Sequence, residues 1–251
     1  MMRVVKVGGR AQGDPALVAS ILAAWRAAPG GLVLVHGGGD DVTELQRTLG
    51  REPQFHGGRR VTTANELAVV RMVLSGTVNK RLAVALRAAN AVGISGEDAG
   101  LIEAAIVDPT LGRVGHPVRV NPAILARLLT GGFLPVVSPL AREAGQVNGA
   151  GLNVNADDAA AALAVAIFAD ELLLLADVEG VLDRGAPIRT LDPSGARALM
   201  ARGMAGGGMT AKLQAACAAL EGGVARVRIG DLSAITNPDA GTLLTFEPST
   251  V

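Results

Sequence analysis

The feature that most constrains the fold is a repeated alternation of short aliphatic runs with longer helical patterns. The aliphatic runs are nearly continuous, which is typical of strands buried on both faces of a sheet. They span residues 3–8, 32–36, 91–95, 134–139, 171–177 and 226–231. The helical patterns span residues 15–28, 40–49, 63–88, 121–131, 156–169, 193–202 and 209–222. This alternation predicts an α/β fold with a mainly parallel sheet that helices cover on both faces.

The longest helical pattern has one apolar stripe, because its large aliphatic residues recur at i+3 and i+4 steps. The stripe consists of Leu67, Val70, Leu74, Val78, Leu82 and Leu86. Segments 54–62 and 101–120 contain β-branched residues punctuated by glycine, and we predict that both form hairpins. No internal repeat or linker interrupts the 251 residues, so the chain is expected to form one domain that has room for two lobes.

Composition narrows the class of partner. With 23 basic and 23 acidic residues the chain has no net charge, and aromatic residues make up only 2%. It therefore has neither the basic surface nor the stacking platforms of nucleic-acid binders. The longest apolar run, 159–169, is too short to cross a bilayer, and no signal-type segment opens the chain. Cys217 is the single cysteine of the sequence and therefore has no partner for a disulfide bond within the chain. We expect a cytoplasmic protein with a small-molecule partner and a buried Cys217.

Glycine clusters mark a candidate anion site. They occur at the ends of predicted strands or at helix starts, namely at Gly8-Gly9, Gly37–Gly39, 95–98 and Gly206–Gly208. Ligands of parallel sheets bind beyond the carboxyl ends of the strands. Glycine lets backbone N–H groups approach a ligand closely, and helix N-termini attract negative charge. The first two clusters follow consecutive strands, which predicts that they bind one anionic group.

The lysines reinforce this prediction, since the chain has only three, Lys6, Lys80 and Lys212. Lys6 lies inside a buried type of strand, where an ammonium group is costly unless it meets an anion. It shares a strand face with Gly8. Lys212 follows a GGGMT turn near a helix start. Both could bind a phosphoryl oxygen or merely extend to solvent. Lys80 lies off the apolar stripe and is expected to be structural or superficial.

Three further segments are candidate site elements, and each has a plainer alternative. The segment LNVNADD (152–158) could orient cations around a phosphate or simply cap the next helix. Arg59 and Arg60 could grip a carboxylate through two parallel hydrogen bonds or stay solvated. Asp177 ends a buried strand and could meet a ribose hydroxyl or order the following glycine turn.

Seven motifs of the sequence follow one another in the order found in acetylglutamate kinases, which belong to the amino-acid kinase superfamily. They are KVGG, VHGGG, GRRVT, VNK, NVNAD, DVEGVL and GGGMTAK. The sequence resembles that family over nearly its whole length. The resemblance implies a three-layer α/β/α sandwich, the amino-acid kinase fold, as a single domain of residues 1–251. Residues 1–170 would form a lobe for N-acetyl-L-glutamate and the dimer contact, and residues 171–251 a lobe for ATP.

The resemblance also implies roles for single residues. Lys6 and Lys212 would neutralise the phosphoryl group during transfer, and Asp157 would orient both lysines. Backbone N–H donors to the phosphates or the reacting group would be Gly8, Gly9 and Gly38. The acetylamino acid would be held by Gly38, Gly39, Arg60 and Asn153, with Arg60 on its α-carboxylate. The nucleotide pocket would be lined by Asp177, Val178, Glu179, Gly180, Val181, Leu182, Met204, Ala205 and Gly206.

The implied reaction transfers a phosphoryl group from ATP to the side-chain carboxylate, which yields N-acetyl-L-glutamyl 5-phosphate on the arginine route. Mg²⁺ would arrive with ATP, held through phosphate and solvent oxygens rather than by protein side chains. The sequence lacks the additional N-terminal helix of arginine-inhibited hexameric relatives. We therefore expect a homodimer without that feedback and with no nucleic-acid or membrane partner.

Three features depart from the family pattern, and two rival functions are also left open. Asp40 and Asp41 adjoin the proposed anion site, Glu97 stands where relatives often have a basic or neutral residue, and the segment after Ile229 matches less well. One rival is a kinase for aminoadipate or glutamate attached to a small acidic carrier protein, which would favour a basic docking face. The other is a non-catalytic ligand sensor of the same fold. Superfamily members acting on aspartate, glutamate, carbamate or UMP fit GRRVT and NVNAD less well.

Overall fold

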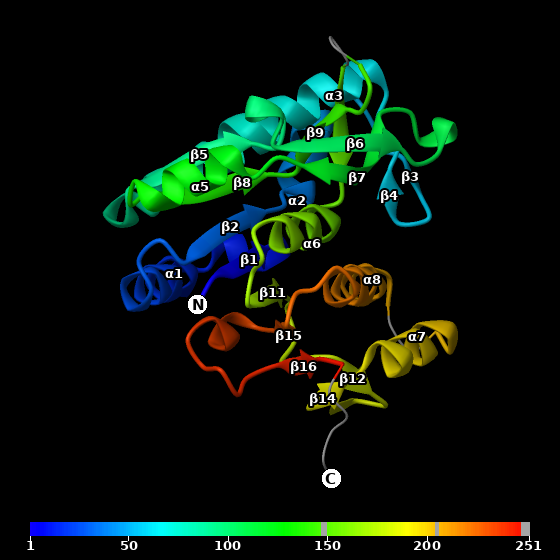
Figure 1. Cartoon of the computed structure of the whole chain (residues 1–251). Coiled ribbons are helices and arrows are strands. Elements are labelled where there is room, and N and C mark those ends of the chain that lie inside the picture. The colour runs from blue at the N-terminus through cyan, green and yellow to red at the C-terminus, as the bar shows by residue number, and fades with distance from the viewer. Residues whose placement is uncertain (147–149, 204–205, 247–251) are drawn as a thin grey trace.

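An eight-stranded sheet forms the centre of the computed structural model, which describes residues 1–146, 150–203 and 206–246 (Figure 1). In spatial order its strands are β14 (Thr190–Leu191), β16 (Thr242–Leu244), β15 (Arg226–Gly230), β11 (Glu171–Leu175), β1 (Arg3–Val7), β2 (Leu32–His36), β8 (Leu134–Ser138) and β5 (Ala91–Ser95). Within the described residues every neighbouring pair is parallel except β15 and β16. The six predicted strands and the mainly parallel sheet are confirmed.

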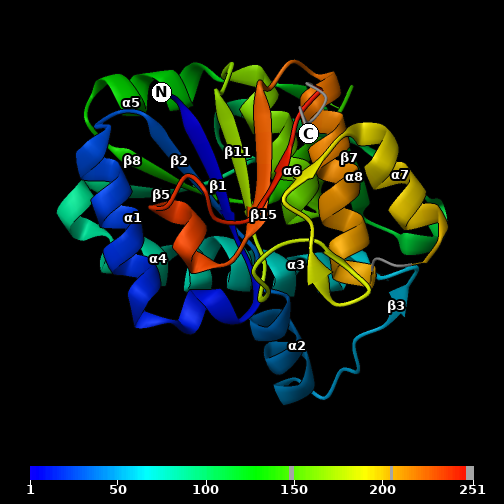
Figure 2. The ribbon, with the colours of Figure 1, turned by 90° about the horizontal axis from the view of Figure 1, so that it is seen from below.

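Helices pack on both faces of this sheet, which gives the predicted three layers (Figure 2). One face is covered by α6 (Ala156–Ala166), α7 (Pro193–Ala201) and α8 (Gly207–Glu221). The other is covered by α1 (Pro15–Ala27), α4 (Asn79–Ala85) and the 3₁₀ turn η6 (Leu232–Ile235). In addition, α2 (Gly39–Thr48) follows β2 and α5 (Ala123–Thr130) packs on β8. No helix in the described ranges is both long and apolar enough to cross a membrane.

The predicted long helix, 63–88, is interrupted in its middle. It consists of α3 (Ala64–Arg71), a π-helical segment η2 (Met72–Val78), α4, and a closing 3₁₀ turn η3 (Arg87–Ala89). A capping box of Thr63 and Glu66 starts it. The prediction of one regular helix was wrong because residues 75–77, Ser-Gly-Thr, are weak helix formers that tolerate a wider turn. All six residues of the apolar stripe are nevertheless buried.

A small closed barrel lies beside the sheet and carries part of the site. Its strands are β6 (Ile102–Ile106), β7 (Val114–Val120), β9 (Leu140–Glu143) and β10 (Gly151–Val154). The predicted hairpins are confirmed as β6–β7 and as β3 (Phe55–His56) with β4 (Arg59–Arg60). The β3–β4 turn needs two consecutive glycines, because Gly57 and Gly58 have φ of 55° and 76°. Sequence analysis missed β10, whose alternating asparagines were interpreted only as capping or site residues.

The remaining elements are short. They are the 3₁₀ turns η1 (Gly9–Gly13), η4 (Asp98–Gly100) and η5 (Pro109–Leu111), and the hairpin of β12 (Leu182–Asp183) and β13 (Ala186–Pro187). Aliphatic residues of β1, β2, β8 and β11 are almost fully buried and form the core. Cys217 is buried in α8, as predicted. The fold thus places the ends of β1 and β2 and the starts of α6 and α8 around one centre.

Candidate functional site

Two lysines that are distant in sequence meet on one carboxylate. Lys6 Nζ, from β1, lies 3.0 Å from Asp157 Oδ1, and Lys212 Nζ, from α8, lies 3.1 Å from the same oxygen. Asp157 lies in the first turn of α6, where a negative charge is favourable. The side chains of Lys6 and Lys212 are only 9% and 12% exposed, so neither merely extends to solvent.

Burial and charge set the protonation of this triad. Burial alone raises the pKa of Asp157, but the ammonium groups of Lys6 and Lys212 outweigh it and hold the pKa below its ordinary value. Burial, reinforced by the positive charge of Lys6, lowers the pKa of Lys212 to about 8, although Asp157 opposes this shift. The triad has one negative and two positive charges at neutral pH. An anion that approaches the two lysines therefore meets a net positive charge.

The lysines open on a cavity of about 240 Å³ that we call the lysine pocket. It is lined by Lys6, Gly8, Leu175, Ala176, Asp177, Val178, Gly208, Met209 and Lys212. A second cavity of about 230 Å³, the distal pocket, shares Val178 and Met209 with it and adds Gly180, Val181, Leu182, Leu199 and Gly206. The segment after β11 thus places most of its predicted residues around these pockets. Glu179 lines neither of them, and Met204 and Ala205 lie outside the described residues.

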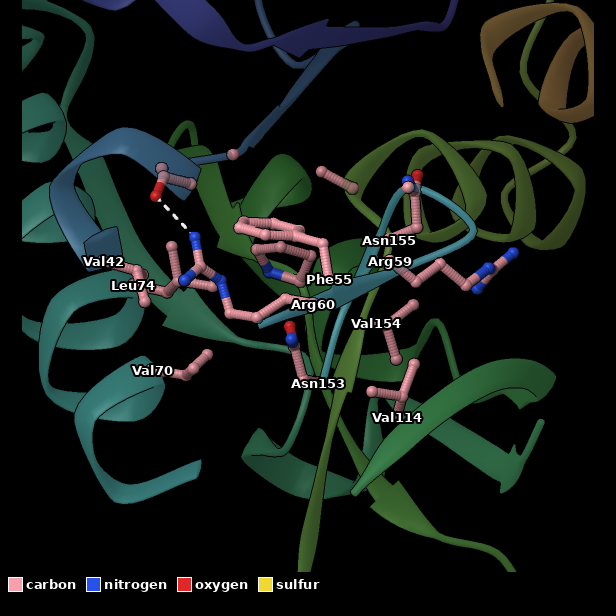
Figure 3. A pocket seen from close by; sticks show the side chains of 16 residues that line it. Val42, Phe55, Arg59, Arg60, Val70, Leu74, Val114, Asn153, Val154 and Asn155 are labelled. Carbon is pink, nitrogen blue, oxygen red and sulfur yellow. Dashed lines mark hydrogen bonds between the residues drawn. The ribbon is translucent and has the colours of Figure 1, made fainter. Parts of the chain in front are cut away.

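A further cavity, of about 230 Å³, is lined in part by the β3–β4 hairpin, and we call it the hairpin pocket (Figure 3). Its polar lining comes from the glycine turn after β2, the hairpin and β10; its apolar wall comes from α2, α3 and η2. The lining residues are Gly37–Gly39, Val42, Phe55, Gly58–Arg60, Val70, Leu74, Val114, Pro139 and Asn153–Ala156. The predicted residues Gly38, Gly39, Arg60 and Asn153 are therefore brought together.

Arg60 is held firmly at one end of the hairpin pocket. Its guanidinium group donates hydrogen bonds to Gly39 O at 2.9 Å, to Thr43 Oγ1 at 2.8 Å, and to Gln46 Oε1. It also stacks on the Phe55 ring, 4.7 Å from its centre (Figure 3). Arg59 points the other way and forms an ion pair with Asp158 at 3.3 Å. Arg60 alone thus faces the glycine turn.

The segment 152–158 combines site and capping roles. Asn153 lines the hairpin pocket and donates to Thr62 Oγ1 at 3.1 Å. Asn155 is the N-cap of α6, since its side chain accepts from the N–H groups of Asp157 and Asp158. The capping alternative therefore holds for Asn155, and this cap fixes the turn that carries Asp157.

The hairpin pocket and the lysine pocket adjoin at two glycine turns. Gly8 lines the lysine pocket, and Gly37 lines the hairpin pocket. A Cβ atom on Gly37 would lie 3.8 Å from Gly8 Cα, and one on Gly8 would lie 2.6 Å from Lys6 Nζ. A side chain at position 8 would therefore displace the Lys6 ammonium group from its present place. Gly9 follows as the first residue of η1.

The residues that depart from the family pattern have partners of their own. Asp41 pairs with Arg81 at 2.9 Å, and Asp40 is exposed in the first turn of α2. Glu97 binds Arg71 through two hydrogen bonds of 2.9 and 2.6 Å. Lys80 is exposed and donates to Gly93 O at 2.7 Å, in line with the predicted structural role. Across the described ranges, no group of three or more His, Cys, Asp or Glu side chains could hold a metal ion.

Sequence analysis missed several residues of the site. Val70 and Leu74 were assigned only to a core stripe, yet they also line the hairpin pocket. Phe55, Thr43 and Gln46, which hold Arg60, had no motif to mark them. The apolar stripe was the one signal available, and it does not distinguish a core wall from a pocket wall.

A model of the amino acid kinase family matches residues 1–231, which include every element around the lysine triad. The chain belongs to the amino acid kinase family. Within it, an acetylglutamate kinase of Cereibacter sphaeroides is 42% identical to this chain, over 96% of this chain and 86% of its own length. That of Rubrobacter xylanophilus is 43% identical, over 97% of this chain and 97% of its own length. The Roseiflexus acetylglutamate kinase is 42% identical over 98% of this chain and 94% of its own.

Solved structures agree with the family assignment. A Streptococcus mutans protein superposes with a TM-score of 0.86 at 30% identity, covering 98% of this chain and 99% of its own. The Giardia carbamate kinase superposes with a TM-score of 0.75 at 18% identity, over 98% of this chain and 99% of its own, which supports the fold alone. The amino-acid kinase fold predicted from the sequence is thus confirmed.

Proposed function

We propose that this chain is a kinase that transfers the γ-phosphoryl group of ATP to the side-chain carboxylate of N-acetyl-L-glutamate. The product would be N-acetyl-L-glutamyl 5-phosphate, an intermediate of arginine biosynthesis. The observation that carries the proposal is the meeting of Lys6 and Lys212 on Asp157, beside the lysine pocket, which adjoins the hairpin pocket at Gly8 and Gly37. The substrate is inferred from the acetylglutamate kinases that are 42–43% identical over nearly the whole chain.

The two pockets suit an end-to-end arrangement of acceptor and donor. The acceptor would lie in the hairpin pocket with its α-carboxylate on Arg60 and its amide near Asn153 and Gly39. Its side-chain carboxylate would then point toward Gly8, where the two pockets adjoin. ATP would occupy the lysine and distal pockets, along residues 177–182 and 204–206. Alignment of this kind supplies much of the rate in phosphoryl transfer.

During transfer a carboxylate oxygen forms a bond to the γ-phosphorus while the bond from phosphorus to the β,γ-bridging oxygen breaks. ADP departs with that electron pair. Lys6 and Lys212 would neutralise the charge on the phosphoryl oxygens, and Asp157 would hold both ammonium groups in place. The N–H groups of Gly8, Gly9 and Gly38 would donate to the phosphates or to the reacting carboxylate.

Mg²⁺ would enter with ATP and neutralise charge on its β and γ oxygens. The residues of the lysine pocket fit phosphate, since two ammonium groups face it. We expect ATP and water to supply most of the oxygens around the ion. We further propose a cytoplasmic homodimer, with the dimer contact and acceptor site in residues 1–170 and the nucleotide site in 171–251.

A coupled assay of ADP release tests the proposed function. The purified chain, with ATP and Mg²⁺, should release ADP when free N-acetyl-L-glutamate is added, and only at background rate without an acceptor. Glutamate, aspartate and carbamate, tested in place of N-acetyl-L-glutamate, serve as control acceptors. Turnover confined to an aminoadipate or glutamate residue on an acidic carrier protein would select the rival kinase. Absence of turnover with any acceptor, together with ligand binding, would select the sensor.

A further inference from the structure

His36 is a buried titratable residue that the proposed reaction does not use. It ends β2, directly before the glycine turn of the hairpin pocket, and is fully buried. Its Nδ1 lies 2.8 Å from Gly37 O, and its Nε2 lies 3.1 Å from Asn79 Nδ2. A histidine and an asparagine buried together are costly unless every polar atom is satisfied. The pair therefore needs an explanation beyond packing.

The surroundings of Asn79 fix the orientation of its amide. Asn79 Nδ2 lies 2.8 Å from Val136 O and 3.3 Å from Ile94 O, so it must be the amide nitrogen. Asn79 Oδ1 accepts from Lys80 Nζ at 3.1 Å. A reversed amide would set oxygen against two carbonyl groups and NH₂ against an ammonium group. Space is reserved for this amide as well, since a Cβ on Gly93 would lie 2.0 Å from Asn79 Oδ1.

The amide orientation in turn fixes the tautomer of His36. Because Asn79 Nδ2 can only donate, Nε2 of the imidazole must be the acceptor, and the ring proton lies on Nδ1. Nδ1–H therefore donates to Gly37 O. Burial lowers the pKa of His36 to about 4, so the ring is neutral at pH 7. The imidazole thus acts as a fixed donor to one backbone carbonyl.

That single hydrogen bond determines where Gly38 N–H points. The N–H of Gly37 is tied to Val7 O at 2.8 Å, and its carbonyl is tied to His36, so the turn is held on both sides. In a trans peptide the carbonyl and the following N–H point in opposite directions, and the described chain has no cis peptide. Gly38 N–H is therefore directed away from His36. Gly38 is buried and lines the hairpin pocket, and the described residues offer its N–H no acceptor.

We propose that His36, held by Asn79, is a positioning residue that aims Gly38 N–H at an oxygen of the acceptor carboxylate. Buried N–H groups without a partner are rare, and one that lines a pocket points to a ligand oxygen. The fixed N–H would stabilise the negative charge on the carboxylate and the transferring group without reorganising during the reaction. This inference deepens the proposed function of the same site and rests on it.

Two substitutions separate positioning from packing. His36→Asn keeps an amide nitrogen near the place of Nδ1 but leaves a cavity, whereas His36→Leu fills the space and has no donor. We expect kcat to fall about 100-fold in His36→Leu and about tenfold in His36→Asn, with KM for ATP unchanged. Thermal unfolding is measured alongside. A purely structural role would make kcat follow the melting temperature, with the leucine variant the more active of the two, and that order would overturn the proposal.

NMR tests the geometry without relying on turnover. The imidazole ¹⁵N shifts of His36 should show a protonated Nδ1 and a bare Nε2 from about pH 5 to 9; a protonated Nε2 would overturn the proposal. Acetate, which carries the carboxylate group of the acceptor, should shift the Gly38 amide resonance in the wild type and in His36→Asn but not in His36→Leu, and an equal shift in all three would also overturn it. Failure of the proposed function is distinguishable, because it appears as wild-type protein that releases no ADP with N-acetyl-L-glutamate.

Discussion

In the described part of the chain two carboxylates, Asp157 and Glu171, are buried among cations, and the two clusters differ in how many hydrogen-bond donors of their cations remain free to bind a ligand. Asp157 holds Lys6 and Lys212 near the carboxyl ends of the strands. Glu171, the first residue of β11, holds Arg3 and Arg228 at 2.6 Å each and Arg226 at 3.4 Å. Burial alone would raise the pKa of Glu171, but these arginines hold it below its ordinary value.

The two clusters differ in how many N–H donors of their cations already form hydrogen bonds within the protein. All five N–H donors of Arg228 are used, since Nε and Nη2 bind Glu171 and the remaining bonds go to backbone carbonyls. Those carbonyls belong to Ala234, Asn237 and Ala240. Lys212 Nζ, with three N–H donors, bonds only to Asp157 among the described residues and faces the lysine pocket. Arg228, whose donors are all used, therefore holds a loop against the sheet, whereas Lys212, which shares Asp157 with Lys6, can still donate hydrogen bonds to a bound ligand.

The largest effect should come from Lys212→Ala. Removing one of two cations at the transferring phosphoryl group should lower kcat about 10³–10⁵-fold, the range of a single transition-state cation in related transfers. The affinity for N-acetyl-L-glutamate, measured by calorimetry, should change little. Glu221→Ala, at the exposed far end of α8, is the matched control and should keep normal kcat. An unchanged kcat in Lys212→Ala would show that Lys212, like Arg228, has only a structural role.

Arg228→Met should affect stability instead. It leaves the buried Glu171 with fewer partners and frees three carbonyl groups, so the free energy of unfolding should fall by about 3–5 kcal/mol. Below the melting transition kcat should stay near that of the wild type. Chemical denaturation measures the loss, with Arg197→Met as control, because that exposed pair with Glu221 should contribute less than about 1 kcal/mol. If Arg228→Met lost kcat but kept its free energy of unfolding, the cluster around Glu171 would not be purely structural.

The smallest effect concerns pH. A lysine is cationic below its pKa, and the pKa of Lys212 is lowered to about 8, so the required charge is lost as pH rises through that value. We expect kcat/KM to fall about tenfold per pH unit above pH 8. Bound anions raise the pKa, so kcat itself should decline only at higher pH. Lys212→Arg should remove the alkaline decline, whereas a flat wild-type profile to pH 10 would contradict the assignment.

The sequence predicted one cluster and not the other, for a physical reason. Lys6 and Lys212 could be marked as candidate anion-binding residues, because one lies in an apolar strand and the other follows a glycine turn, whereas their meeting on Asp157 was implied only by the family resemblance. Glu171 begins an ordinary aliphatic strand, and its pairing depends on β1, β11 and β15 lying in register, which no local pattern specifies. The π-helical segment and the wall of the hairpin pocket were missed likewise, because both depend on tertiary packing rather than on spacing.

The position of β1 has a consequence for how the protein is made. β1 lies between β2 and β11, and Arg3 is paired with Glu171 across the sheet. At ordinary ribosomal speeds about ten to thirty seconds pass between the synthesis of β1 and that of β11, its second neighbour in the sheet. Until then one edge of a strand rich in valine presents bare backbone groups that can pair with any extended peptide nearby. We expect that covering this edge during synthesis favours folding of the nascent chain, and that a gene divided at residue 170 would yield two halves that each present an unpaired strand edge, β1 in one and β11 in the other.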